Sequence, residues 1–343
     1  MSSPSSPSKP VWNWWKIAAL VAIVLGVPTL IGLAPPPRRP FDDKALKLLQ
    51  KNKPTCVLLG DSMLGTRIEE KVLSQLASER CFVLSQPGSS SATWYLMMKN
   101  LVTAQTPPPR TVIILYRNRQ LTLPAHRAEG EYRKSMEPYM QGPEPLIDRL
   151  VIPSQKPPGL LEGAVNAIYP LERQRENVVD KMQSWALDLV ASSREYDRIR
   201  DSAKILFSPK NLRTGTLVDE QEDGGQLSLD PDTHDFEQSV GASFLPVILE
   251  IARSHNIQLV FYEVKRRPRP DGGYGEESVT APAYRVALRA YLEKAGARLF
   301  DETREGDVTL DLYGSGDHIS SANMPRYTEI FWRKVGPLVR PAP

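Results

Sequence analysis

Short apolar runs alternate with amphipathic stretches along most of the chain, and this alternation constrains the fold more than any other feature. Five runs are apolar on both faces, as buried parallel strands are; they cover residues 55–59, 81–84, 111–116, 257–264 and 297–300. Between and after them, apolar residues recur at helical spacing over residues 67–77, 92–102, 239–253, 282–294 and 322–335. Such alternation is typical of α/β folds with right-handed crossovers. We therefore predict an α/β fold with a doubly wound parallel sheet, whose ligands bind at the carboxyl ends of the strands.

The stretch from residue 124 to residue 235 interrupts this alternation because it contains no obvious strand. Segments of this length are rarely without a role in a folded domain. Within it, Leu171–Ala203 carries apolar residues at a period near 3.6, which predicts helix. We interpret the stretch as a helical insertion after the third strand. It would either cover the mouth of the ligand site at the carboxyl ends of the strands or pack on the flank of the sheet, and the sequence favours neither.

An apolar segment near the N-terminus is long enough to cross a bilayer. Residues 17–34 contain no charge, and extending the segment back to Trp14 reaches the roughly 20 residues that a bilayer core requires. Trp14 and Lys16 suit the membrane interface. A cleaved secretory signal is the alternative, but its apolar region usually has roughly 7–15 residues and is followed by a small-residue cleavage site. We predict an uncleaved transmembrane anchor over residues 14–34.

The anchor divides the chain into unequal parts. Positive charges on its two sides are nearly balanced, but a helix so close to the start commonly acts as a signal-anchor and exports the rest of the chain. We therefore predict a cytoplasmic tail (1–13), the anchor, a linker (35–53) and one domain outside the cytoplasm (54–338). The chain would be a single-pass protein of the cell membrane, with this domain in the periplasm or beyond.

Composition excludes one large class of function. Hydrophobic residues make up 41% of the chain and charged residues 24%, which is an ordinary balance for a globular domain. The formal net charge of +3 is spread along the sequence. Because no basic stripe is interleaved with aromatic residues, we expect no nucleic acid among the partners.

A serine follows the first predicted strand, in the sequence Gly60-Asp61-Ser62-Met63. A side chain at this point would be exposed at the carboxyl edge of the sheet, where a neighbouring base can activate it. The spacing differs from the G-x-S-x-G turn of α/β-hydrolases, which disfavours that family. Taken alone, serine and aspartate after a strand are also ordinary helix-capping residues.

Three further motifs make the sequence resemble the SGNH (GDSL-like) hydrolase superfamily, whose first block is a GDS near the start of the domain. Gly88 in SQPGSSS matches the glycine after the second strand, and Asn118 matches the asparagine after the third strand. Asp317-His318 lies where the family has its C-terminal Asp–His pair. The resemblance covers roughly residues 54–335 apart from the insertion, and the order and placement of the four motifs are more specific than any one of them.

The resemblance implies a role for each of these residues. Ser62 would be the nucleophile, His318 the base and Asp317 the acid of a triad. The backbone N–H groups of Ser62 and Gly88 and the side chain of Asn118 would form the oxyanion hole. Taken separately, Gly88 is also suited to a turn and Asn118 to a helix cap. Chemistry of this kind requires no cofactor and no metal, so we expect neither.

The sequence departs from the family pattern in two blocks. The last block normally reads D-x-x-H, but Ser315 occupies the position of the aspartate. Asp317 is the nearest carboxylate and Asp311 the next, although a residue adjacent to the histidine on an extended segment points the other way. A Ser–His dyad, in which a backbone carbonyl orients the imidazole, is therefore an alternative to the triad.

The third block carries Arg117 and Arg119 on either side of the asparagine. These two arginines are candidate substrate-binding residues for an anionic or strongly hydrogen-bonding substrate, or else solvated loop charges. The other histidines, His126, His234 and His255, lie in polar stretches without metal-ligand spacing, and we expect them on the surface.

The two cysteines begin the first and second predicted strands. In a flavodoxin-like strand order these strands are parallel neighbours, so Cys56 and Cys81 would lie near the same, non-catalytic edge of the sheet. An oxidising compartment favours a disulfide between them. Two buried free thiols are the alternative.

Together these observations predict a serine-dependent acyl-ester hydrolase or O-acyltransferase. Membrane-tethered members of the resembled superfamily act on acyl groups of cell-surface glycans, sometimes beside a membrane-bound O-acyltransferase, which would be a partner here. The alternative is a catalytically inactive SGNH-fold module that binds glycan or aids assembly, and a third is a structural scaffold. Apposition of Ser62 and His318 would favour the enzyme, whereas a histidine pointing away would favour the binding module.

Overall fold

The computed structural model describes residues 40–151, 236–268, 280–314 and 316–339. These residues all belong to one unit of the chain. Among them, no helix is both long and apolar enough to span a membrane. The predicted anchor at residues 14–34, most of the predicted insertion and His234 lie outside the described residues.

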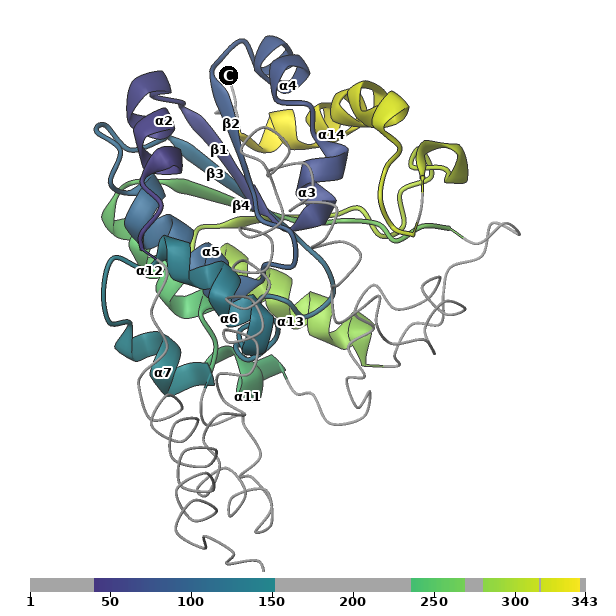
Figure 1. The fold of residues 1–343 in the computed structure, drawn as a ribbon. Helices are drawn as coiled ribbons and strands as arrows, with labels where there is room; N and C mark the ends of the chain where they lie inside the picture. Colours follow the sequence, from purple (N-terminus) through teal and green to yellow (C-terminus); the bar gives the residue numbers. More distant parts are fainter. Residues whose placement is uncertain (1–39, 152–235, 269–279, 315, 340–343) are drawn as a thin grey trace, which may run out of the picture. The chain divides into compact units, whose positions relative to one another are not determined.

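Five parallel strands form one sheet, in the order β2-β1-β3-β4-β5 (Figure 1). Their bounds are Cys56–Gly60 for β1, Cys81–Ser85 for β2, Thr111–Tyr116 for β3, Gln258–Glu263 for β4 and Arg298–Asp301 for β5. Each lies within two residues of a run predicted from apolar content. The prediction of a doubly wound, flavodoxin-like parallel sheet is therefore confirmed. In chain order, β2 is added on one side of β1, and β3, β4 and β5 are added on the other side. Such a switch point creates a crevice at the carboxyl ends of the strands.

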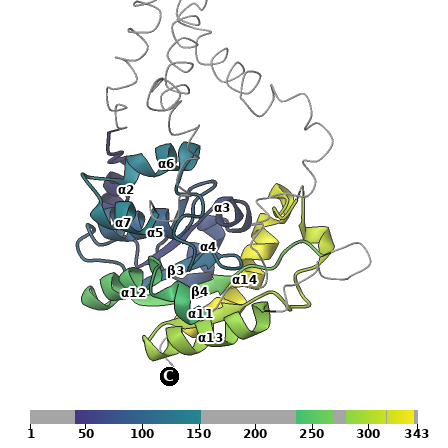
Figure 2. The same ribbon diagram turned by 90° about the horizontal axis from the view of Figure 1, so that it is seen from below.

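Helices cover both faces of the sheet. One face carries α3 (Ser62–Arg67), α4 (Glu70–Ala77) and α14 (Met324–Val339). The opposite face carries α5 (Ser91–Met97) with the π-helical segment η1 (Met98–Val102), α11 (Phe236–Val240), α12 (Leu245–Ser254) and α13 (Ala281–Lys294). Figure 1 shows the two layers on either side of the strands, and Figure 2 shows α11 beside α13. Two short 3-10 turns, η5 (Leu310–Leu312) and η6 (Ser321–Asn323), precede α14.

The two cores follow from the alternation of side chains along each strand. Leu58, Ile113 and Val260 are fully buried against α3, α4 and α14. Their neighbours Val112 and Phe261 are fully buried on the other face. Both faces of the central strands are therefore apolar, and this is the continuous apolar run seen in the sequence.

Two segments differ from the sequence-based interpretation. Part of the predicted linker 35–53 is the helix α2 (Lys44–Asn52), whose Leu49 is fully buried in the core. The described beginning of the insertion contains α6 (Gly130–Met136), the 3-10 turn η2 (Glu137–Tyr139) and α7 (Pro145–Val151). Met136 and Ile147 are buried in the same core. These residues therefore pack on the flank of the sheet, whereas the predicted helical stretch 171–203 lies outside the described residues.

Cys56 and Cys81 are partners in register on neighbouring strands, at the edge opposite the carboxyl ends. Their expected placement is found, but both are free cysteines, so the structure contains no disulfide between them. The hydrogen bond to Cys81 and burial raise the pKa of the Cys56 thiol well above its usual value. A thiol in this state stays protonated, whereas oxidative pairing proceeds through the thiolate. Two free thiols were the alternative left open by the sequence.

Candidate active site

The first motif forms a tight turn from β1 into α3. A side chain at Gly60 would place its Cβ 2.7 Å from the Leu64 Cβ and 3.3 Å from the Leu115 carbonyl oxygen, so only glycine fits there. Asp61 caps α3, because its Oδ1 accepts a hydrogen bond from the Met63 N–H at 2.8 Å. This turn places Ser62 in the first turn of α3, at the carboxyl edge of the sheet.

His318 reaches Ser62 from a small hairpin before α14. Tyr313 and Ile319 form an antiparallel bridge, and the Gly314 N–H donates to the His318 carbonyl at 2.8 Å. The His318 Nε2 lies 3.1 Å from the Ser62 Oγ. The structure therefore brings together two predicted site residues that are 256 positions apart. At this distance the imidazole can accept the proton of the hydroxyl.

Asp317 does not occupy the position of a triad acid. Its Oδ2 pairs with Arg117 Nη1 at 2.9 Å, and its Oδ1 accepts from the Arg267 N–H at 2.8 Å. Among the described residues no carboxylate is hydrogen bonded to His318. The assignment of Asp317 as the acid is thus not supported, because adjacent residues on an extended segment point in opposite directions. Asp311 pairs with Arg326 and does not reach the histidine either.

The three predicted oxyanion donors follow three neighbouring strands. Ser62 follows β1, Gly88 follows β2 and Asn118 follows β3. Within the described part of the chain, the backbone N–H groups of Ser62 and Gly88 and the side-chain amide of Asn118 have no hydrogen-bond partner. Gly88 has a φ of +73°, and a Cβ there would lie 2.7 Å from Tyr132 Cε1. Asn118 also has a left-handed φ of +49°, which asparagine tolerates better than most residues.

The two arginines that were predicted to bind substrate lie in different surroundings. Arg117 lies at the site, where its guanidinium pairs with Asp317, and burial lowers its pKa from the ordinary value. Arg119 is 7% exposed and its guanidinium lies 5.7 Å from the centre of the Tyr284 ring on α13. The guanidinium therefore packs on an aromatic ring, while its Nη1 has no hydrogen-bond partner among the described residues. Arg117 is the one that lies beside Asp317 at the site, and the assignment of Arg119 to substrate binding stays a prediction.

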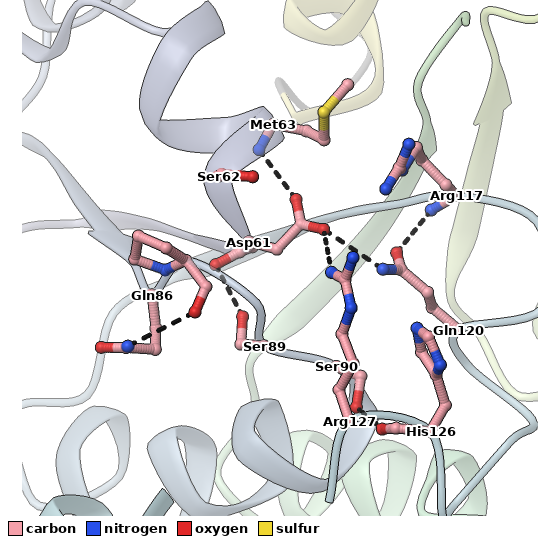
Figure 3. A network of polar contacts seen from close by, with 12 residues as sticks. Asp61, Ser62, Met63, Gln86, Ser89, Ser90, Arg117, Gln120, His126 and Arg127 are labelled. Atoms are coloured by element: carbon pink, nitrogen blue, oxygen red, sulfur yellow. Dashed lines mark hydrogen bonds and ion pairs between the residues drawn. The ribbon is translucent and has the colours of Figure 1, made fainter. Parts of the chain in front are cut away.

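A polar network around Asp61 was not foreseen from the sequence. Asp61 is 2% exposed, and its Oδ2 accepts from Gln120 Nε2 and from Arg127 Nη1, each at 3.2 Å. Figure 3 shows Asp61 between Met63, Gln120 and Arg127, with Ser62 next to it. Asp61 stands in the motif, but Gln120 and Arg127 lie in a loop that matches no pattern. Nothing in the sequence could have indicated them.

His126 belongs to the surroundings of this network and is not the surface residue expected. Its side chain is partly buried, and its carbonyl accepts from Ser90 Oγ at 2.5 Å. Burial, with further contributions from the nearby Arg127 and Arg117, lowers the pKa of His126 to about 4. His255 is exposed at the end of α12, as expected.

The low pKa of His126 predicts a pH-dependent contribution to stability. Because His126 titrates at about 4 when folded and at about 6.5 when unfolded, the unfolded chain binds its proton first. The free energy of unfolding should therefore fall as pH drops from about 6.5 to about 4. Between pH 7.5 and pH 4.5 the free energy of unfolding should fall by about 1–2 kcal/mol more in wild type than in His126→Asn, with the partial exposure of His126 taken into account. Urea unfolding at the two pH values measures this difference, with His255→Asn as the exposed control. Equal losses in wild type and His126→Asn would contradict the prediction.

Similarity to known proteins is found among solved structures, at low sequence identity. No family model matches the chain, and neither does any curated protein. Among solved structures, a GDSL-like lipase from Bacteroides thetaiotaomicron VPI-5482 is similar at a TM-score of 0.35 and 10% identity, over 83% of this chain and 86% of that chain. An acylhydrolase candidate from Bacteroides fragilis NCTC 9343 is similar at a TM-score of 0.38 and 9% identity, over 97% of this chain and 100% of that chain. A candidate lipolytic protein of the G-D-S-L family from Desulfitobacterium hafniense DCB-2 has a TM-score of 0.37 and 12% identity, over 81% of this chain and 98% of that chain.

Proposed function

We propose that this chain is a serine-dependent acyl-ester enzyme of the SGNH type, with Ser62 as nucleophile and His318 as general base. The observation that carries the proposal is the 3.1 Å distance between Ser62 Oγ and His318 Nε2 at the carboxyl edge of the sheet. A nucleophile and a base in hydrogen-bond contact are the minimal requirement for acyl transfer through serine. A module that only binds glycan has no need of this contact.

The steps follow from the positions of these groups. Ser62 Oγ attacks the carbonyl carbon of the ester while its proton passes to His318 Nε2. The negative oxygen of the tetrahedral intermediate accepts hydrogen bonds from the Ser62 and Gly88 N–H groups and from the Asn118 amide. Collapse breaks the ester bond, and the departing alcohol takes the proton from His318. An incoming hydroxyl, deprotonated by His318, then attacks the acyl-serine. The bond between Ser62 Oγ and the acyl carbon breaks, the product leaves, and His318 returns its proton to Ser62 Oγ.

The catalytic unit is a Ser–His dyad. Asp317 binds Arg117 and the Arg267 N–H, and it thereby fixes the loop that carries His318. The hydrogen bond from Gly314 to the His318 carbonyl fixes the backbone of the base. Asp317 therefore acts on the position of the base.

We further propose that the acyl group belongs to a glycan at the cell surface and that the chain acts outside the cytoplasm from an N-terminal anchor. The partly buried Arg117 at the site suits a strongly hydrogen-bonding or anionic substrate. Water and a sugar hydroxyl are similar nucleophiles, so deacylation and O-acyl transfer use the same residues. In the transfer case, a membrane-bound O-acyltransferase would be the natural donor partner.

The experiment that tests this function uses the full chain in detergent with p-nitrophenyl acetate as acyl donor. Release of p-nitrophenol that requires both Ser62 and His318 supports the enzyme. Adding a neutral oligosaccharide, followed by mass spectrometry, separates the two activities: gain of one acetyl group shows transfer, and acetate as sole product shows hydrolysis. A folded wild-type chain without any turnover would contradict the enzyme and favour the glycan-binding module.

A further inference from the structure

We infer that Gln120 is a positioning residue, which holds the oxyanion donor Asn118 in register with the nucleophile Ser62. The inference rests on the proposed function and assigns a role that none of the motifs contains. It comes from the way one buried side chain joins the turn after β1 to the turn after β3.

Gln120 closes the turn that presents Asn118. Its backbone N–H donates to the Arg117 carbonyl at 3.1 Å, and its side-chain Oε1 accepts from the Arg117 N–H at 2.8 Å. The turn between them contains Asn118 at a φ of +49°. Among the described residues the Asn118 amide has no hydrogen-bond partner, so this turn fixes the backbone from which the amide projects.

The same side chain ties this turn to the nucleophile. Gln120 Nε2 donates to Asp61 Oδ2 at 3.2 Å, and Asp61 is the residue directly before Ser62. The Asp61 Oδ1 caps α3 through the Met63 N–H, so the carboxylate is fixed to the helix that carries the serine. Ser62 and Asn118 are thus connected through two buried side chains, each 2% exposed.

The orientation of the Gln120 amide is determined by its partners. The acceptor Asp61 requires the NH₂ group, and the donor Arg117 N–H requires the carbonyl oxygen. The reverse orientation would place two oxygens against each other in a buried site, which is costly. A fixed amide between two turns is suited to precise placement, and a displacement of about 1 Å at a catalytic group can cost about 10²-fold in rate.

Gln105 provides a matched control. It is also 2% exposed, and its Nε2 donates to the carbonyls of Pro54 and Pro107, each at 2.9 Å. These prolines precede β1 and β3, so Gln105 joins the same two strands at the opposite edge of the sheet. Gln105→Ala and Gln120→Ala should lower the free energy of unfolding by similar amounts, about 1–3 kcal/mol.

Activity should separate the two variants. We expect Gln120→Ala to lower kcat for p-nitrophenyl acetate about 10–100-fold with KM nearly unchanged, and Gln105→Ala to stay within about 2-fold of wild type. The pH profile should keep its midpoint because His318 is untouched. In the wild-type background, Asn118→Ala should lower kcat by about 10²–10³-fold. In the Gln120→Ala background the factor by which Asn118→Ala lowers kcat should be at least about ten times smaller, because the donor is already misplaced.

Hydrogen exchange supplies a readout that does not depend on turnover. Backbone amide hydrogens in peptides covering residues 117–120 should exchange faster in Gln120→Ala than in wild type, and at the wild-type rate in Gln105→Ala. Equal kcat losses in both variants, additive effects of Gln120→Ala and Asn118→Ala, or unaltered exchange at 117–120 would each overturn the inference. Turnover that does not depend on Ser62 would instead overturn the proposed function.

Discussion

Replacing Ser62 with alanine is expected to lower kcat for p-nitrophenyl acetate by roughly 10⁶-fold and to abolish covalent labelling by a fluorophosphonate probe. The hydroxyl that lies 3.1 Å from His318 Nε2 would then be missing, and no acyl-enzyme could form. His318→Ala should cost a similar factor, because the two groups act as one unit. The double variant should be no slower than either single one. Initial rates and in-gel labelling measure these effects.

The chain contains a second Ser–His contact that serves as control. Ser254 Oγ lies 3.0 Å from His255 Nδ1, but both residues are exposed at the end of α12, and the histidine also contacts the Ile251 carbonyl. Ser254→Ala and His255→Ala should leave turnover within about 2-fold of wild type. If Ser62→Ala retained its turnover or its labelling, another residue would be the nucleophile and the proposed function would fail.

Replacing Arg67 with alanine is expected to lower the free energy of unfolding by about 3–5 kcal/mol. Arg67 is fully buried at the end of α3, and its Nη2 donates to the Lys265 carbonyl at 2.9 Å. Its guanidinium also lies 5.5 Å from the centre of the Tyr327 ring and 5.7 Å from that of Tyr313. Removal leaves a cavity between α3, α14 and the segment after β4, and the Lys265 carbonyl keeps only the hydrogen bond that it accepts from the Tyr313 hydroxyl at 3.0 Å. Urea unfolding measures the loss.

Two further variants separate the causes. Arg67→Met fills much of the volume without the hydrogen bonds, so its loss should be smaller, about 1–3 kcal/mol. Arg110→Ala removes a 2.9 Å ion pair with Glu79 in which the arginine side chain is 57% exposed, and such pairs contribute about 1 kcal/mol or less. If Arg67→Ala cost no more than Arg110→Ala, the buried arginine would not be what joins α3 to its neighbours.

Local pattern was enough to predict most of the sheet. The strands β1, β3 and β4 are buried on both faces, so their apolar runs stand out against the polar helix surfaces between them. Their carboxyl ends could be located in the sequence, and Ser62 with them. The helices α2 and α3 were not predicted, because each is short and its position depends on packing against distant residues such as those of η1 and α14.

The sequence by itself determined the parallel α/β fold, the place of Ser62 after β1 and the candidacy of His318, since each depends on local order along the chain. The tertiary structure decided which groups meet. It directs Asp317 to Arg117 and Arg119 to Tyr284, and it joins Gln120 and Arg127 to Asp61. The direction of a polar side chain in a loop depends on partners tens or hundreds of residues away. A sequence pattern can place such a residue at the edge of the sheet, but only the folded chain shows what it binds.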